Sequence, residues 1–551
     1  MSQTKKAYWQ RPNPRRNLSP RLWRPVHLVE FQARRTQHYL LFSTNLLYNS
    51  AHIIDSLAAM EQRTKMARKI LVASVAILLF TGSCGRIQKD NEISQRIEKY
   101  LFEMEKIGFF GSVLIALKGE IVVSKGYGFR NIERGLKNTP TTIFDIGSIT
   151  KQFTSAAILK LEMQGKLSTD DKLSEYFNAL PGDKRNITIH DLLRHQSGLK
   201  STVGGDYEKI AKEEFLKEVM DSPLRFKAGT RFSYSNIGYS LLAMIIEQVS
   251  GQTYETYLYE NLWKPARMES TGYSRPKFET NDIAVGYYPD NMVWGKPTDK
   301  EWDETAPYWH LLGNGGILST TEDLYRWHNA LSTDLILSSE AKEKLYFPKL
   351  RAGENGDSIY AYGWDVNKTS RNTRRVWHNG SNHIFYADFL RFIDEDVVLI
   401  TLSNKAHPNF DSVNDEMSKI VFRENYTPTI PVTDNETNRA FTNRVIQAIQ
   451  DFGIEKAKIL YEGRNEGVGL LEFAMRSRGF DLLDDNRPDL AIQIFEMNVF
   501  AFPYSAKALQ GLGEAYMETG KKDSAIRYFR ESLAIEPDNL FVKHMIKELE
   551  K

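Results

Sequence analysis

The chain has 551 residues, 41% of them hydrophobic and 12% aromatic, so it is too long for one core and too apolar for a disordered protein. Its 72 Lys and Arg residues balance 70 Asp and Glu residues, and this balance gives no support to a nucleic-acid partner. The single cysteine excludes an intrachain disulfide and a zinc site built from several thiolates. We expect two or more domains.

The first 84 residues divide at Met66. Residues 1–65 are basic and lack a clear period, so we exclude this doubtful leader from fold prediction. A start codon assigned too far upstream would explain its presence. From Met66, a basic stretch, an apolar run at residues 70–80 and a small-residue segment ending at Cys84 follow in the order of a secretory signal. The apolar run has 11 residues, whereas a membrane-spanning helix needs about 20.

The position of Cys84 at the end of this signal suggests a location. Residues 66–84 resemble a bacterial lipoprotein signal, although Thr81 departs from the usual aliphatic residue. The resemblance implies that Cys84 is lipidated and that the protein is anchored to a membrane of the bacterial cell envelope, in the periplasm or at the outer membrane. A signal without lipidation, or a short buried helix with an ordinary cysteine, is the alternative.

The next region begins with a helical pattern from about Ile93 and has strand-like segments at both ends. Residues 111–117 and 120–124 are rich in strand-forming residues on either side of a two-residue turn and predict a β-hairpin. Residues 383–392 and 397–402 predict a second pair. The segment between the pairs is mainly helical. The sequence therefore predicts an α+β domain over residues 95–425, with an antiparallel sheet closed by its terminal strands, flanking helices and a helical subdomain.

After a polar stretch at residues 426–437, residues 438–551 are helical and repeat with a period of 34. The equivalent pairs are Gly479 and Gly513, Leu482 and Tyr516, Ala491 and Ala525, Phe495 and Phe529, and Pro503 and Pro537. These positions resemble tetratricopeptide repeats, which implies an all-α domain of two to three units with a capping helix. Such a domain either binds a protein partner or braces the preceding domain, and both interpretations stay open.

The first candidate catalytic pair is Ser148 and Lys151. They precede an apolar helical segment that stops near Gly165, so Ser148 is expected at a helix N-terminus, where free N–H groups favour developing negative charge. A spacing of three places Lys151 on the same helical face, within reach of the serine hydroxyl. A serine three residues before a lysine also arises by chance, so this pair alone is weak evidence.

Two further segments make the pattern specific. Tyr234-Ser235-Asn236 opens an apolar helix at residues 237–249, and His378-Asn379-Gly380-Ser381 precedes the last hairpin, where a backbone N–H on an edge strand is expected to face the serine. In this order and spacing, the three segments resemble the serine β-lactamase and penicillin-binding protein superfamily, especially its class C and esterase-like branch. The resemblance covers residues 95–425. Singly, each side chain is as well explained as a helix cap, a core residue or a solvated lysine.

The resemblance implies a serine hydrolase without a cofactor that works through an acyl-enzyme. Ser148 would be the nucleophile, and Lys151 and Tyr234 would share its proton. Asn236 would orient Lys151 and the substrate amide. His378 and Gly380 would contribute to substrate binding, and the backbone N–H groups of Ser148 and Ser381 would form the oxyanion hole. A base role requires either a neutral Lys151 or an ionised Tyr234, and the sequence leaves this choice open.

His378 is the main departure from the family pattern, because it stands where these enzymes usually have the lysine of a Lys-Thr-Gly segment. That lysine binds a substrate carboxylate, so its replacement favours an uncharged ester or other acyl compound. Arg374 or Arg375 is a candidate to restore the charge. The expected partner is a small ester or amide. A hydrolase that acts on cell-wall peptides of D-amino acids would share every catalytic residue and differ only in its pocket, so this alternative stays open.

The competing class of function is non-enzymatic. A lipid-anchored sensor or scaffold of the penicillin-binding type would bind a cell-wall fragment, and the helical repeats would contact a protein partner. Retention of Ser148, Lys151 and Tyr234 together argues against this interpretation, because a sensor needs no activated nucleophile. His190, His195 and His328 form no His-Glu-x-x-His pattern, so we expect no metal site.

Overall fold

The computed structural model describes residues 60–62, 64–69, 88–178, 180–300, 302, 306–350, 358–407, 410–465 and 467–550. The chain forms two compact units, residues 1–87 and 88–551, and each is considered by itself. In the first unit, the described residues are helical. Most of the basic leader, together with Cys84, lies outside the described residues. No helix within the described ranges is both long enough and apolar enough to cross a membrane.

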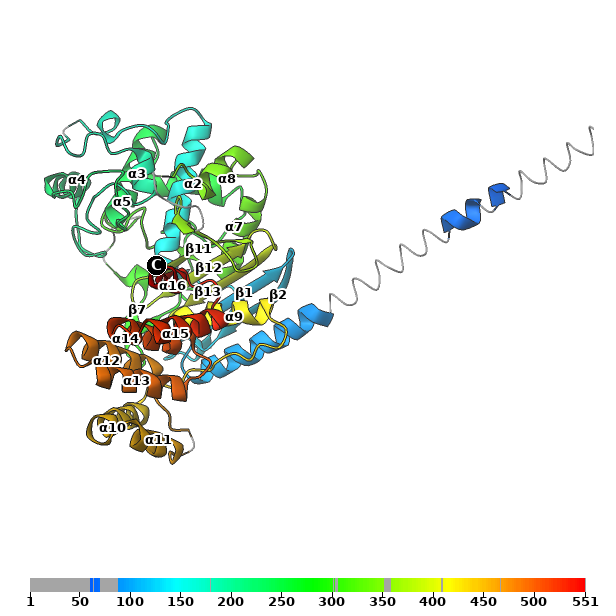
Figure 1. Cartoon of the computed structure of the whole chain (residues 1–551). Helices are drawn as coiled ribbons and strands as arrows, with labels where there is room; N and C mark the ends of the chain where they lie inside the picture. Colours follow the sequence, from blue (N-terminus) through cyan, green and yellow to red (C-terminus); the bar gives the residue numbers. More distant parts are fainter. Residues whose placement is uncertain are drawn as a thin grey trace, which may run out of the picture. The chain divides into compact units, whose positions relative to one another are not determined.

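The centre of the second unit is a seven-stranded antiparallel sheet in the order β2-β1-β13-β12-β11-β10-β9 (Figure 1). The strands are β1 (Gly111–Leu117), β2 (Glu120–Tyr127), β9 (Ser358–Tyr360), β10 (Asp365–Lys368), β11 (Arg374–Ser381), β12 (Tyr386–Phe392) and β13 (Val397–Ser403). Small pairs are formed by β3 (Phe129–Asn131) with β4 (Leu136–Lys137), β5 (Phe144–Asp145) with β8 (Leu318–Ser319), and β6 (Gly286–Tyr287) with β7 (Val293–Gly295).

The first and last strands of this sheet are neighbours, as predicted. Strand β1 pairs with β13 from Gly111 opposite Ser403 to Leu117 opposite Val397. The turn that joins β1 to β2 has positive φ angles at both Lys118 (53°) and Gly119 (80°), which suits a tight two-residue hairpin turn. Local turn chemistry therefore sets the first hairpin, and a long-range pairing closes the sheet.

Both faces of the sheet are covered, which explains why every residue of β1 is buried. Val113 and Ile115 belong to an apolar cluster with the helix at residues 88–106 and with α9 (Phe410–Phe422). Leu114 and Ala116, which alternate with them, belong to the cluster of the helical subdomain. Because successive side chains of a strand point to opposite faces, one apolar strand joins the two layers.

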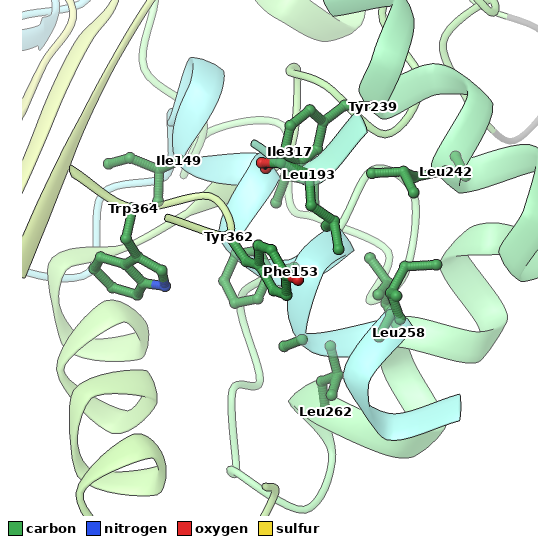
Figure 2. Packing of buried hydrophobic residues seen from close by; sticks show 14 of the residues in the cluster. Ile149, Phe153, Leu193, Tyr239, Leu242, Leu258, Leu262, Ile317, Tyr362 and Trp364 are labelled. Carbon is green, nitrogen blue, oxygen red and sulfur yellow. The ribbon is translucent and has the colours of Figure 1, made fainter. Parts of the chain in front are cut away.

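The helical subdomain surrounds α2. Its helices are α2 (Thr150–Met163), α3 (Ile189–Leu193), α4 (Lys212–Asp221), α5 (Asn236–Ser250), α6 (Tyr254–Leu258), α7 (Thr321–Ser332) and α8 (Ser339–Tyr346). Figure 2 shows Phe153 of α2 among apolar side chains from several of these elements. The Phe153 ring lies 5.0 Å from that of Trp327 and 5.8 Å from that of Trp263. A helix buried on every side is a rigid platform for the residues at its N-terminus.

The C-terminal helices confirm the 34-residue repeat. They are α10 (Glu436–Phe452), α11 (Ile454–Glu462), α12 (Glu472–Asp484), α13 (Pro488–Ala501), α14 (Ala506–Glu518), α15 (Lys522–Ile535) and α16 (Leu540–Leu549). A Cβ on Gly479 would lie 2.5 Å from the ring of Phe495, and one on Gly513 would lie 2.7 Å from the ring of Phe529. The repeated glycines therefore make room for the repeated phenylalanines.

The repeat helices contact the sheet domain through α9. The Lys419 ammonium lies 3.0 Å from Glu416 and 3.4 Å from Glu536, which follows α15. The Arg423 guanidinium donates to the backbone oxygen of Ile535 at 2.8 Å. Helix α9 therefore packs on the sheet through its apolar side and bonds to the repeats through its basic residues.

Candidate active site

Ser148 lies in a short 3-10 turn, Gly147–Ile149, that leads directly into α2, as expected for a helix N-terminus. Gly147 has a φ of 50°, a conformation that favours glycine. Below the turn, Asp145 accepts hydrogen bonds from the Gly147 N–H at 2.7 Å and from the Asn382 amide at 2.9 Å. Burial raises the pKa of Asp145 to about 6, although both hydrogen bonds oppose the shift. These contacts fix the backbone around the serine.

Lys151 is fully buried beside Ser148. Its Nζ lies 2.9 Å from the Ser148 Oγ and donates to the backbone oxygen of Asn314 at 2.8 Å. Burial holds the pKa of Lys151 well below its usual range, and the nearby Asp206 offsets this only in part. A neutral amine can donate to the Asn314 carbonyl and still accept a proton from the serine hydroxyl. The Asn314 side chain donates to Ser240 and to the His310 carbonyl, which fixes this acceptor.

Tyr234 lies on the other side of the lysine, with its ring centroid 4.7 Å from the Lys151 Nζ. Burial raises the pKa of Tyr234 well above its usual value, and a hydrogen bond to Ser148 only partly opposes the shift. The tyrosine is therefore protonated near neutral pH. Of the two routes that the sequence left open, these pKa shifts favour a neutral Lys151 over an ionised Tyr234.

His195 packs against Tyr234, although no sequence motif placed it at the site. Its ring centroid lies 4.1 Å from that of Tyr234, and its Nδ1 accepts a hydrogen bond from the Ser235 N–H at 3.1 Å. Burial lowers the pKa of His195 well below its usual range, and a proton on Lys151 would lower it further. The φ of His195 is 54°, which is uncommon for a residue other than glycine. The packing of the surrounding loop holds this backbone conformation, so the local sequence does not reveal where the ring lies.

Strand β11 approaches the serine turn, but it is not the edge strand that we predicted. It lies between β12 and β10, because β9 and β10 extend the sheet beyond it. The pairing with β10 ends at Trp377 opposite Asp365. Residues 378–381 therefore continue past β10 and have a local free edge, which is the edge that faces the serine turn.

Gly380 allows this approach. A Cβ on Gly380 would collide with the carbonyl oxygen of Ile146, and it would lie 2.9 Å from the backbone nitrogen of Ser148. A Cβ on Gly147 would lie 2.5 Å from the backbone nitrogen of Ser381. The backbones of the serine turn and of β11 are thus in close contact at the place where we predicted an oxyanion hole.

His378 is buried and neutral. Its Nδ1 is hydrogen-bonded to the carbonyl oxygen of Asn379 and must carry the proton, because a carbonyl only accepts. The Nε2 therefore accepts from the Tyr360 hydroxyl at 3.0 Å. Burial and Lys151 lower the pKa of His378 to about 3. No cation thus replaces the family lysine at this position.

The two arginines proposed as substitutes are engaged elsewhere. Arg374 forms a salt bridge with Asp394 at 2.6 Å, and Arg375 donates to the side-chain oxygen of Asn367 at 3.1 Å. Neither lines the cavity in front of Ser148. The position of Asn236 also limits its predicted role. Its Oδ1 is buried without a hydrogen-bond partner in the described part of the chain, and Lys151 is held by the Asn314 carbonyl instead.

A cavity of about 360 Å³ opens in front of the serine. It is lined by Ser148, Phe232, Tyr234, Tyr360, Asp365, His378, Asn379, Gly380 and Ser381. The structure therefore gathers most of the predicted site residues around one cavity and adds Phe232, Tyr360 and Asp365, which carry no sequence motif. Among the described residues, no group of three or more His, Cys, Asp or Glu side chains is arranged to hold a metal ion.

Known proteins provide close comparisons. The sequence profile of the beta-lactamase family matches residues 104–421, and that of the tetratricopeptide repeat matches residues 506–539. Protein flp of Staphylococcus aureus is 30% identical over 304 residues, which are 53% of this chain and 59% of flp. The putative penicillin-binding protein PbpX of Bacillus subtilis is 32% identical over 273 residues, 50% of this chain and 65% of PbpX. The chain thus spans less than two thirds of these relatives.

Solved structures agree with this match. The octameric penicillin-binding protein homologue from Pyrococcus abyssi has a TM-score of 0.52 at 27% identity, covering 64% of this chain and 81% of that one. EstCE1, a hydrolase with promiscuous acyltransferase activity, has a TM-score of 0.52 at 17% identity, covering 60% of this chain and 99% of that one, and shares the fold. The family profile covers more than half of the residues. The chain belongs to the beta-lactamase family and carries a tetratricopeptide repeat near its C-terminus.

Proposed function

We propose that the protein is a serine hydrolase that cleaves a small ester or amide through an acyl-enzyme. The observation that carries this proposal is the distance of 2.9 Å between the Ser148 Oγ and the buried Lys151 Nζ. An exposed lysine would be charged and unable to accept a proton, whereas this amine has a pKa held well below its usual range. The pair therefore has the geometry and the proton affinity of a nucleophile with its base.

In the proposed reaction, Lys151 takes the hydroxyl proton while the Ser148 Oγ bonds to the substrate carbonyl carbon. The backbone N–H groups of Ser148 and Ser381 stabilise the oxyanion, and one such donor is commonly worth about 2.7–4 kcal/mol. The protonated Tyr234 hydroxyl passes a proton to the leaving alcohol or amine and is reprotonated from Lys151. Water then attacks the acyl-enzyme and gives up a proton to Lys151. The bond from the acyl carbon to the Ser148 Oγ breaks, Lys151 returns the proton to that oxygen, and the acid leaves.

The charges around the cavity support a substrate without a carboxylate. His378 is neutral at the position of the family lysine, and Arg374 and Arg375 are bonded elsewhere. Penicillins and peptides ending in D-alanine are carboxylates, so this site lacks the cation that would bind them. EstCE1, which shares the fold, is a hydrolase with promiscuous acyltransferase activity, and this fits the acyl-enzyme of the proposal.

The test is covalent labelling of a form that begins at Gly85. A fluorophosphonate should add once to the parent and not to Ser148→Ala, as read by intact mass. Ser155→Ala is the matched control, because Ser155 is a buried serine on the same helix with a partner in Tyr239. Labelling of the parent and of Ser155→Ala, but not of Ser148→Ala, supports the hydrolase. No adduct on a folded parent would favour the non-catalytic sensor.

We also propose that Cys84 is the lipidated first residue of the mature protein in the cell envelope. The basic, apolar and small-residue zones that precede Cys84 support this. Labelled palmitate should enter the protein made in a bacterial host, and Cys84→Ser should abolish the label and release the protein from membranes. Incorporation that survives Cys84→Ser would contradict the proposal.

A further inference from the structure

Asp365 is a carboxyl group in the catalytic cavity that the proposed reaction does not use. It begins β10 and lines the same cavity as Ser148. Its side chain makes no hydrogen bond and no salt bridge to any described residue, although it is only partly exposed. Most acidic groups with so little access to water are paired, because a bare carboxylate is costly to desolvate. An unpaired one at the reaction centre points to a ligand.

The groups around Asp365 leave its charge available. The charged group that most affects it is Arg375, whose guanidinium donates to Asn367 and lies over the ring of Trp377. Burial, and to a smaller extent the charge of Asp365, raises the pKa of three nearby tyrosines, Tyr234, Tyr239 and Tyr360. Two of their hydroxyls are committed elsewhere, since Tyr239 donates to the Leu193 carbonyl and Tyr360 donates to His378.

Other carboxyl groups near the site add negative charge to that of Asp365. Asp206 is the charged residue that acts on Lys151, and Asp145 is buried below the serine turn. The two nearest histidines, His195 and His378, are neutral because burial lowers their pKa values. In the proposed base role Lys151 is neutral before the reaction, because burial lowers its pKa. These carboxyl groups favour a cationic ligand over an anionic one, although the charge of Arg375 opposes them at Asp365.

The remaining walls also suit a cation. Phe232 is 49% exposed at the cavity, and its ring lies 5.8 Å from that of Tyr360. Aromatic faces attract ammonium groups, and a carboxylate beside them supplies a charged acceptor. Burial raises the pKa of Asp365 to about 7, which a bound cation would lower again.

From this geometry we infer that Asp365 binds the protonated amine of the substrate's acyl group, so that the substrates are aminoacyl esters or amides. The inference rests on the proposed hydrolase function and specifies its substrate class. A group in the acyl portion stays in the cavity through both half-reactions, so the Asp365 contact orients the ester and then the acyl-enzyme. The site would thereby discriminate between acyl groups of equal size by their charge.

The test compares alanine methyl ester, as both enantiomers, with methyl isobutyrate, in which a methyl group replaces the ammonium. We expect kcat/KM at pH 7 to favour at least one alanyl enantiomer by about tenfold to a hundredfold, the range for a charge-assisted contact. Asp365→Asn should remove this preference, because it should lower the alanyl rate far more than the isobutyrate rate. Glu120→Gln, on the exposed strand at the opposite edge of the sheet, is the control and should keep the preference.

A second measurement does not need turnover. Protection of Ser148 from the fluorophosphonate is compared for (1-aminoethyl)boronic acid and isopropylboronic acid, in the parent and in Asp365→Asn. Stronger protection by the aminoboronic acid, lost in Asp365→Asn, supports the inference. Equal protection by both, or a preference that survives Asp365→Asn, overturns it. If the parent forms no fluorophosphonate adduct at all, the hydrolase proposal itself is wrong. Failure of that proposal is therefore distinguished from failure of the Asp365 inference alone.

Discussion

The hydroxyl of Tyr360 lies 3.0 Å from the Nε2 of His378, at the point where a family lysine would reach into the cavity. Because the Nδ1 is bonded to the Asn379 carbonyl, both ring nitrogens have protein partners. A histidine held in this way shapes the cavity but has no proton to offer to a carboxylate. The replacement of the lysine therefore changes the charge of the site as well as its volume.

The first prediction concerns pH. The pKa of His378 is lowered to about 3, so the ring stays neutral from pH 5 to pH 8 and should not affect reactivity in that range. The rate constant for fluorophosphonate labelling, measured against pH, should have the same shape for the parent and for His378→Gln. An inflection between pH 5 and pH 8 that is present only in the parent would show that His378 titrates there.

Lys151→Met should slow the labelling of Ser148 by about 10²- to 10⁴-fold, the usual contribution of a general base. The folded protein should not lose stability, because the change removes a buried amine whose pKa shift reflects the cost of its burial. Lys160→Met is the control on the same helix, since its Nζ donates to the Ile336 carbonyl, away from the serine. Labelling of Lys151→Met within tenfold of the parent would contradict the base role.

Gly380→Ala should impair both stability and reactivity. Its Cβ would collide with the Ile146 carbonyl and push β11 away from the serine turn. We expect a loss of about 1–3 kcal/mol in urea unfolding, as for other overpacked sites, together with a large fall in the labelling rate. Gly182→Ala, whose Cβ meets nothing within 4 Å, should leave both quantities unchanged. A fully reactive Gly380→Ala protein would show that the close approach is not required.

Asp365→Asn should stabilise the protein, more at pH 8 than at pH 5. The folded-state pKa of Asp365, about 7, lies above its ordinary value of 3.8, so the folded state binds its proton more tightly than the unfolded state does. Stability from this group is therefore lost as pH rises from about 4 to about 7. Asparagine avoids this loss, which for a shift of about three units is on the order of 4 kcal/mol at pH 8. Urea unfolding at the two pH values measures it. A gain of equal size at both would contradict the shifted pKa.

The contact between the repeats and α9 predicts an energetic coupling. A double-mutant cycle with Lys419→Met and Glu536→Gln should give a coupling of about 1 kcal/mol, because both side chains are largely buried. The exposed pair Lys89 and Glu424 is the comparison and should give less than about 0.5 kcal/mol. Equal couplings for the two pairs would mean that the repeats do not brace the sheet domain through Lys419.

Local signals in the sequence predicted the elements that local chemistry determines. The turn at Lys118-Gly119 depends on neighbouring residues and was predicted correctly. The start of α5 also depends on neighbouring residues, and it was predicted at Ile237 and lies at Asn236. The 34-residue period was visible because each glycine faces a phenylalanine at a fixed spacing. Likewise, Ser148 and Lys151 are one helical turn apart, so their proximity follows from the helix itself.

Residues that reach the site from distant segments had no such signal. The carbonyl of Asn314 holds Lys151 from 163 positions away, and a backbone oxygen leaves no trace in the residue type. Tyr360 and Asp365 enter the cavity because β9 and β10 add to the sheet beside β11. We predicted β11 as an edge strand because these two short strands, of three and four residues, lacked a clear alternating pattern.

The pairing of β1 with β13 also has a consequence for biosynthesis. The two strands are separated by about 290 residues, and the second edge of β1 is paired only when β13 lies beside it. A ribosome that has released the first hairpin must synthesise almost the entire domain before this strand gains its neighbour. The serine turn depends in the same way on β11, so catalytic competence arises late, in one cooperative step, and a truncated nascent chain exposes an apolar strand without a functional nucleophile.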